Sequence, residues 1–308
     1  MDYRNPVYDA YFADPFVLRL DDGSYLAYGT GSVVGGRVFE VLSSPDLHNW
    51  TSVGGALEPA PGELGSDYWA PEVGRIDGRW CLYYSVGHGD VGHHLRVAIA
   101  DDPRGPFHDQ GVNLTPDERF AIDPHPYRDE DGTWYLFHAR DVLEGERVGT
   151  MLAVDVLADV TRLAGQAQTI LTPSGDWQLF QRGRAMYDSV YDWHTLEGPF
   201  LRRHDGRHYC FYSGGNWQEA TYGVAYAVAS APLGPWLEPS PAVSPLLATI
   251  PGEVVGPGHC SVVAAPDGDD AIVYHAWDVD RTRRRMCIDA LIWTDDGPTT
   301  PGPTTWRA

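Results

Sequence analysis

The 308-residue sequence contains no lysine, so its 22 basic residues are all arginine. They stand against 43 acidic residues, which gives a formal net charge of −21. Binding to a nucleic-acid backbone requires clustered cations, and an anionic membrane surface attracts basic segments. The shortage of positive charge therefore excludes nucleic acid and membrane surfaces as partners. A neutral or cationic small partner remains open.

Long apolar runs and cysteines are also scarce. No stretch of about 18 apolar residues occurs, so the sequence predicts no membrane-spanning segment. The N-terminal residues MDYRNPVYDAYFADP lack the basic and apolar regions of a secretory signal. We therefore expect a cytoplasmic protein, either a monomer or a small homo-oligomer. The four cysteines are far apart and form no Cys-x-x-Cys pair, which favours buried free thiols over a zinc site; they are Cys81, Cys210, Cys260 and Cys287.

Short apolar segments joined by turns dominate the rest of the sequence. Hydrophobic residues make up 43% of the chain and aromatic residues 12%, enough for a large core. An Asp-Gly pair, which favours a tight hairpin, recurs five times between apolar segments while helical periodicity is nearly absent. The five pairs are Asp22-Gly23, Asp77-Gly78, Asp131-Gly132, Asp205-Gly206 and Asp267-Gly268.

This recurrence predicts an all-β protein, a five-bladed β-propeller. Length alone suggests two domains of roughly 150 residues, but the repeats divide residues 1–308 into five blades of a single domain. The blades start near residues 14, 69, 123, 197 and 259. Two stacked β-sandwiches would not explain a fivefold recurrence. The longest inserts, at about 159–191 and 239–257, are expected to be functional, because loops of that length usually are.

Aligning the repeats on their glycines brings five side chains to one repeat position. Nine residues before each glycine stand Asp14, Trp69, Asp123, Glu197 and His259. These residues should open the innermost strand of each blade and converge at one mouth of the central channel. A single aspartate in a loop is usually a turn former, but three carboxylates at one repeat position are harder to explain structurally.

Carboxylates brought together repel one another, so one of them keeps its proton near neutral pH. That arrangement places a general acid beside a general base, as glycoside hydrolysis requires. Aromatic rings suit the apolar faces of sugars, and we expect Trp69, Phe12 and Trp217 to bind substrate. Core packing is the alternative for each aromatic residue taken singly.

Five segments in order resemble glycoside hydrolase family 43, from about Asn5 to Trp293. They are NPVYDAYFADPFVLR, WAPEV, AIDPHPYRDEDGTWYLF, LEGPFLRRHDGRHYCFYSGG and GPGHCSVV. The resemblance implies that Asp14 is the general base, Glu197 the general acid and Asp123 the carboxylate that orients the acid and tunes its pKa. It also implies inversion, with Asp14 and Glu197 roughly 6.5–9.5 Å apart to admit a water.

The resemblance implies two further site residues. His259 would lie on the channel axis near a hydrated calcium or other ion. The alternative is a histidine that is hydrogen-bonded without metal, because one neutral nitrogen is a poor calcium ligand. Arg284, in RTRRRMCIDALIW, would reach the substrate or pair with the carboxylates, whereas Arg283 and Arg285 would point to the opposite face. No cofactor is required for the chemistry.

The expected activity is hydrolysis of arabinose- or xylose-containing oligosaccharides from plant polysaccharides. The family's β-xylosidases often add a C-terminal β-sandwich, for which this chain leaves no room. An exo-acting α-L-arabinofuranosidase on arabinan fragments is therefore favoured over a β-xylosidase or an endo-arabinanase. Two other classes are a non-catalytic sugar-binding propeller, which needs no acid–base trio, and a retaining fructan enzyme, whose carboxyl groups lie about 5–5.5 Å apart.

Overall fold

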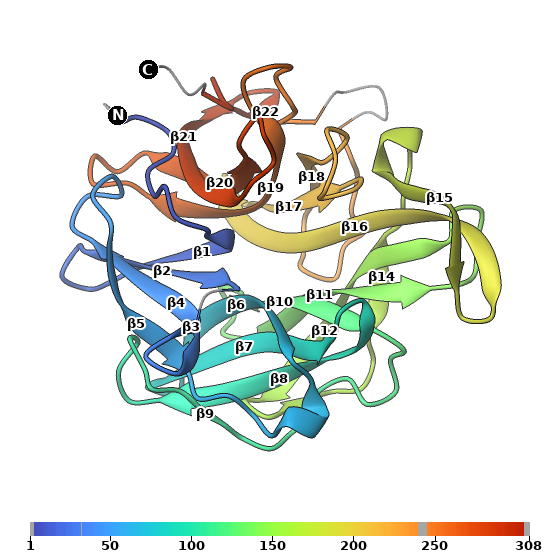
Figure 1. The fold of residues 1–308 in the computed structure, drawn as a ribbon, viewed down its shortest axis with the longest axis horizontal. Helices are drawn as coiled ribbons and strands as arrows, with labels where there is room; N and C mark the ends of the chain where they lie inside the picture. The colour runs from blue at the N-terminus through green and yellow to red at the C-terminus, as the bar shows by residue number, and fades with distance from the viewer. Residues whose placement is uncertain (1–2, 32, 240–244, 305–308) are drawn as a thin grey trace.

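The computed structural model describes residues 3–31, 33–239 and 245–304 (Figure 1). Within these residues the chain has no α-helix, and its helical turns are two short 3-10 segments, η1 (Gly62–Leu64) and η2 (Asp176–Gln178). No helix in this part of the chain is long and apolar enough to cross a membrane. The predicted all-β class is confirmed. Residues 240–244 of the predicted insert at 239–257 lie outside the described residues.

The strands of the described residues form four hydrogen-bonded sheets. The first contains β1 (Ala13–Arg19), β2 (Tyr25–Thr30), β3 (Val33–Val34), β4 (Arg37–Ser44) and β5 (Thr51–Leu57). The second contains β6 (Asp67–Ile76), β7 (Arg79–His88), β8 (Val91–Ala100) and β9 (His108–Asp109). The C-terminal sheet contains β19 (Val255–Ala264), β20 (Asp270–Trp277), β21 (Arg284–Thr294) and β22 (Gly297–Thr299).

The largest sheet consists of two antiparallel groups joined by a short parallel pairing of β12 with β16. One group contains β10 (Ala121–Arg128), β11 (Trp134–Val142), β12 (Gly149–Asp159), β13 (Arg162–Leu163) and β14 (Gln168–Leu171). The other contains β15 (Leu179–Met186), β16 (Ser189–His204), β17 (Arg207–Gly214) and β18 (Gly223–Ala229).

Five inner strands contact one another in a closed series. β1 contacts β6 and β19, β10 contacts β6 and β16, and β16 contacts β19. Figure 1 shows the sheets following one another in chain order around a common centre, where these strands lie. Side chains at the start of the inner strands are thereby brought together from the whole length of the chain.

The Asp-Gly pairs form the predicted hairpins, with two different loop lengths. In the second and fourth repeats the pair is the whole turn, and Asp77 and Gly78 have φ of 50° and 79°, as a two-residue primed turn requires. In the other three repeats the loop has one more residue. Leu20, for example, pairs with Ser24 across a loop that ends at Gly23.

The different loop lengths change which residues are equivalent. Each inner strand has a register shift and a residue with positive φ, and these residues are Asp14, Ala70, Asp123, Gly198 and His259. The sequence alignment was therefore wrong by one residue at Trp69 and Glu197. The hairpin loops of those two repeats are one residue shorter, so the glycine lies one residue closer to the positive-φ position of the inner strand. Trp69 and Glu197 directly precede the equivalent position.

The core lies between the sheets and is rich in aromatic residues. Tyr28, Tyr84, Phe211 and Tyr274 are fully buried in a single cluster that spans several sheets. All four cysteines are buried and free, which confirms the prediction of buried thiols.

Candidate active site

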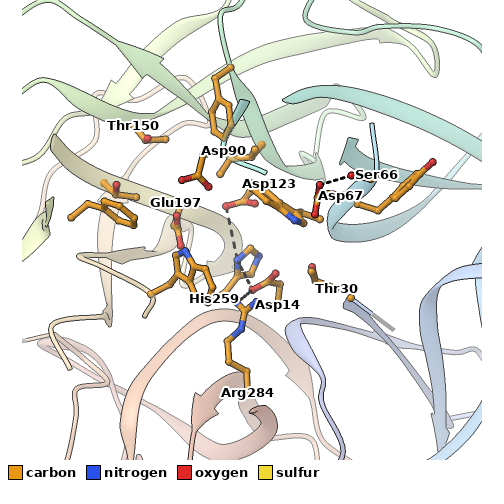
Figure 2. Close-up of a pocket in the computed structure, with 18 of the residues that line it drawn as sticks. Asp14, Thr30, Ser66, Asp67, Asp90, Asp123, Thr150, Glu197, His259 and Arg284 are labelled. Atoms are coloured by element: carbon orange, nitrogen blue, oxygen red, sulfur yellow. Dashed lines mark hydrogen bonds and ion pairs between the residues drawn. The ribbon is translucent and has the colours of Figure 1, made fainter. Parts of the chain in front are cut away.

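A cavity of about 430 Å³ opens where the five inner strands meet. Its lining includes most of the residues predicted from sequence: Asp14, Trp69, Asp123, Glu197, Trp217, His259 and Arg284. Figure 2 shows Asp14, Asp123 and Glu197 around a common space, with Arg284 reaching Asp14 from β21. Side chains up to 270 residues apart in the sequence thus form one site.

A bulge in each inner strand builds the base of this site. A bulge places two residues against one on the partner strand; in β16 the two residues are Gly198 and Pro199, directly after Glu197, which pairs with Ser213 of β17. A positive φ costs a non-glycine residue about 1–3 kcal/mol, and neighbouring sheets stabilise it by binding the N–H that the ladder leaves unpaired. The N–H of Asp14 donates to Nδ1 of His275, and that of Ala70 donates to Oγ1 of Thr30. The N–H of Gly198 donates to Oδ2 of Asp123, and that of His259 donates to Oγ of Ser213.

Asp14 is surrounded by nitrogen groups. Its Oδ1 lies 3.2 Å from Nη1 of Arg284, 3.2 Å from Nδ1 of His275 and 3.5 Å from Nδ1 of His259. Burial alone raises the pKa of Asp14, but that pKa is held well below its usual value, chiefly by the charge of Arg284. Asp14 is therefore ionised at neutral pH and can accept a proton.

Glu197 holds its proton to higher pH than an ordinary glutamate does. Burial raises the pKa of Glu197 to about 7, the Tyr222 hydroxyl that donates to it lowers the pKa, and the charge of Asp14 raises it. Asp123 accepts the N–H of Gly198 at 2.8 Å, and burial and the charges of Glu197 and Asp14 raise its pKa well above the usual value. One cavity thus holds a carboxylate beside two carboxyl groups that favour the protonated form.

Arg284 follows one of the two alternatives expected for it, the pairing with a carboxylate. It pairs with Asp14 and also lines the cavity. Its guanidinium lies 4.4 Å from the centre of the Trp217 ring, and Nη2 donates to the hydroxyl of Tyr11 at 2.7 Å. The ring beneath it and the tyrosine beside it fix the direction of the guanidinium.

The prediction for Phe12 needs correction. Phe12 does not line the cavity, and only 1% of the residue is exposed. Its ring packs edge-on against Tyr8, and a Cβ at Gly29 would lie 2.8 Å from it. Phe12 is a core residue, whereas Trp69 lines the cavity and stacks on His93 at 3.7 Å between ring centres.

The family model "Glycosyl hydrolases family 43" matches residues 3–299, nearly the whole chain. The chain belongs to glycoside hydrolase family 43. It is therefore an enzyme that cleaves glycosidic bonds with inversion, rather than a non-catalytic sugar-binding propeller or a retaining enzyme.

Known relatives of this family 43 enzyme carry several activities in their names. A beta-D-galactofuranosidase (xynD) of Aspergillus niger is 31% identical over 96% of this chain and 84% of its own length. An extracellular exo-alpha-(1->5)-L-arabinofuranosidase of Streptomyces avermitilis is 25% identical over 92% of this chain and 60% of its own length. A crystal structure of a thermostable family-43 glycoside hydrolase is 32% identical, with a TM-score of 0.85 over 98% of this chain and 97% of that one. Other matches are named beta-xylosidase and probable arabinan endo-1,5-alpha-L-arabinosidase A.

The calcium ion that family 43 implies near His259 stays a prediction. His259 is buried, and its Nδ1 faces Asp14 and Asp123 at 3.5 and 3.9 Å. Among the described residues, no group of three or more His, Cys, Asp or Glu side chains is placed to hold a metal. Calcium takes six to eight oxygen ligands, so the side chains here do not form such a site and water would have to supply nearly all of them.

Several cavity residues carry no signal in the repeats. The predicted insert at 159–191 contributes three residues of β15 to the lining: Phe180, Arg184 and Met186. Arg184 reaches across to Asp90 in the β7–β8 turn, with Nη2 and Oδ2 2.7 Å apart. The length of the insert indicated a functional segment, but nothing in the sequence indicated its partner.

Asp141 and Thr150 form a second buried polar group in the lining. Asp141 accepts hydrogen bonds from Thr150 Oγ1 at 2.8 Å and from the hydroxyl of Tyr187, in the β15–β16 turn, at 2.7 Å. Burial raises the pKa of Asp141 to about 6. The bond from Tyr187 attaches the hairpin to β11, and the bond from Thr150 joins β12 to β11.

Proposed function

We propose that this family 43 enzyme is an exo-acting α-L-arabinofuranosidase that removes terminal arabinofuranose from arabinan fragments. The observation that carries the hydrolytic reaction is that one cavity holds an ionised Asp14 and a Glu197 whose pKa is raised to about 7. The relatives named as exo-arabinofuranosidases support the substrate.

In the proposed reaction Asp14 is the general base and Glu197 the general acid. A water oxygen attacks the anomeric carbon while Asp14 takes its proton, and the bond to the leaving oxygen breaks as Glu197 protonates that oxygen. Both transfers belong to one displacement, so the two carboxyl groups are expected to stand roughly 6.5–9.5 Å apart. Arg284 keeps Asp14 ionised until it receives the proton.

Asp123 is proposed to orient the acid and tune its pKa. It accepts the N–H of Gly198, the residue that follows Glu197, and so fixes the backbone that carries the acid. Asp123 and Glu197 would repel each other if both were ionised, so at least one of the two carboxyl groups favours keeping its proton. The proposed substrate-binding groups are Trp69, Trp217 and Arg284.

Exo action is supported by the β15–β16 hairpin, whose residues line one side of the cavity. The pairing of Arg184 with Asp90 joins this hairpin to the β7–β8 turn, and both residues line the cavity. A bridge of this kind obstructs a polysaccharide that continues past the site on that side. A chain end is then the part of the substrate that fits.

The architecture proposed for the whole chain is a single five-bladed propeller domain. The sheets that begin with β1, β6 and β19 each correspond to a blade. The two groups of the largest sheet, which begin with β10 and β16, would be two more. The closed series of contacts among the inner strands supports this division.

β-D-Galactofuranosidase is a second candidate, because the relative of that name is 31% identical. The two furanose rings share their configuration from C1 to C4, and galactofuranose has one additional exocyclic CHOH group. The cavity therefore has to accommodate one larger substituent rather than a different ring.

The test is a panel of 4-nitrophenyl α-L-arabinofuranoside, β-D-galactofuranoside and β-D-xyloside, together with linear arabino- and xylo-oligosaccharides. We expect the highest kcat/KM on the arabinofuranoside and release of single arabinose units. NMR of the first product should show the inverted anomer. Preference for either other glycoside, or release of internal fragments, would replace the substrate assignment.

A further inference from the structure

Tyr222 is a buried residue that contacts Glu197 and has no part in the mechanism proposed for the three carboxyl groups. It lies just before β18, is 1% exposed, and donates its hydroxyl hydrogen to Oε1 of Glu197 at 2.5 Å. Among the described residues, Glu197 is the one hydrogen-bond acceptor that this hydroxyl reaches. No described residue donates a hydrogen bond to the other oxygen, Oε2.

The fold makes room for this ring at a specific position. A Cβ at Gly258 would lie 1.8 Å from Cε1 of Tyr222, so the second glycine of Gly-Pro-Gly-His is needed for the close approach. The ring also lies parallel to that of His275, with centres 5.8 Å apart and planes 12° apart. Tyr222 therefore connects the acid, Glu197, with His275, which contacts the base, Asp14.

We propose that Tyr222 is the positioning residue of the general acid: its hydroxyl occupies Oε1 of Glu197, so the catalytic proton is held on Oε2. This inference rests on the acid role proposed for Glu197. Burial and the charge of Glu197 raise the pKa of Tyr222 well above its usual value, so the phenol stays a hydrogen-bond donor. A donor at Oε1 leaves Oε2 as the oxygen that can carry the carboxyl hydrogen.

The same hydrogen bond acts during the proton transfer. The Oε2–H bond breaks as the leaving oxygen takes the proton and its bond to the anomeric carbon opens, while the attacking water loses a proton to Asp14. Glu197 then carries a negative charge, and the bond from Tyr222 becomes charge-assisted and stronger. Tyr222 thus stabilises the carboxylate that the transition state is forming.

Other charged groups also face Glu197, and they set the background for any pH effect. Asp14 on β1 and Asp90 in the β7–β8 turn disfavour its ionised form, and Arg284 on β21 favours it. Asp123 on β10, which itself favours the protonated form, also faces Glu197. A Tyr222→Phe substitution leaves all four in place. A change in the ionisation of Glu197 in this variant therefore reports the lost hydroxyl.

The experiment compares wild-type enzyme, Tyr222→Phe and Tyr274→Phe by the pH dependence of kcat/KM. The control Tyr274 is also buried, and its hydroxyl donates to the carboxylate of Asp289 at a distance of 2.6 Å. Neither residue lines the cavity. We expect the alkaline limb of the Tyr222→Phe profile to move up by about one pH unit, because the bond that favoured ionised Glu197 is gone. The Tyr274→Phe profile should keep the wild-type limb.

A second test of the proposal compares kcat on substrates with different leaving groups. For Tyr222→Phe we expect kcat to fall about 10–100-fold on an arabino-oligosaccharide and much less on an activated aryl arabinofuranoside, which needs little protonation. An unmoved limb together with equal losses on both substrates would overturn the proposal. If the phenylalanine variant does not fold, 3-fluorotyrosine at position 222 tests it with a stronger donor of nearly the same shape, which should move the limb down; an unmoved limb there also overturns it.

A Glu197→Ala variant in the same assays separates this inference from the proposed function. If Glu197→Ala loses activity equally on both kinds of substrate, the acid role itself fails. If Glu197→Ala behaves as an acid variant while Tyr222→Phe resembles wild type, the inference about Tyr222 alone fails.

Discussion

At the residue scale, the carboxyl groups of the site differ because their neighbours differ. Asp14 faces a guanidinium and two imidazoles, whereas Glu197 faces a phenol and other acids. The motifs identified the carboxyl groups, since Asp-Pro and Glu-Gly-Pro stand at recognisable places in the repeat. Tyr222 lies outside the repeat positions that the alignment compared, so the sequence provided no signal for it.

The first prediction concerns the pH dependence of the wild-type enzyme. Glu197 must be protonated to act as an acid, and its pKa is raised to about 7. We therefore expect kcat/KM to be full below that value and to fall about tenfold per pH unit above it. A profile that keeps rising from pH 7 to pH 9 would exclude Glu197 as the acid.

The second prediction concerns the charge that keeps Asp14 ionised. Arg284→Met removes the ion pair to Asp14, so the pKa of Asp14 should rise and the acidic limb of the profile should move to higher pH. We expect kcat/KM to fall at least about 100-fold, from the desolvated charge that is left unpaired. Arg285→Met is the matched control, because Arg285 is the next residue on β21 and pairs with the exposed Asp9. Equal effects of the two variants would contradict the role given to Arg284.

At the element scale, the bulged start of each inner strand and the β15–β16 hairpin shape the cavity. The Asp-Gly pairs predicted hairpins in the right places. They did not distinguish two-residue from three-residue loops, since Asp-Gly fits both, and this produced the one-residue error at Trp69 and Glu197. The contact of β15 with the β7–β8 turn joins side chains 94 residues apart, which no local pattern encodes.

The third prediction tests the bridge between these two hairpins. Arg184→Ala breaks the pairing with Asp90, and we expect KM for arabino-oligosaccharides to rise several-fold while kcat on an aryl arabinofuranoside changes little. Stability should change by less than about 1 kcal/mol, because Asp90 is largely exposed. The control is Arg182→Ala on the same hairpin, whose partner Asp192 lies outside the cavity lining. The same KM change in both variants would mean that the bridge has no specific role.

At the scale of the whole molecule, the N-terminal segment is joined to the C-terminal sheet. Asn5 is buried, and its side chain donates to the carbonyl of Ile288 and accepts the N–H of the same residue, at 2.9 and 2.8 Å. Tyr8 pairs with Met286 on the same strand, β21. The repeats predicted one continuous arrangement, but the sequence did not show which residues join its two ends, because these contacts depend on the closed path of the chain.

The fourth prediction follows from this junction. Asn5→Ala leaves both backbone groups of Ile288 without partners in the core, and we expect it to lower the free energy of unfolding by about 2–4 kcal/mol. The kcat of the folded enzyme should be unchanged, since Asn5 lies outside the cavity lining. Chemical denaturation measures the effect, with the exposed Asn49→Ala as control. A loss below about 0.5 kcal/mol would show that the junction contributes little.

The division of labour between Asp14 and Glu197 is the central claim, and one comparison tests it most directly. The measurement is kcat/KM of Glu197→Ala and Asp14→Ala on arabinobiose and on 2,4-dinitrophenyl α-L-arabinofuranoside. We predict that Glu197→Ala loses at least about 1,000-fold on arabinobiose but less than about tenfold on the activated glycoside, and that Asp14→Ala is inactive on both. Equal losses of Glu197→Ala on the two substrates, or retained activity of Asp14→Ala, would contradict the account.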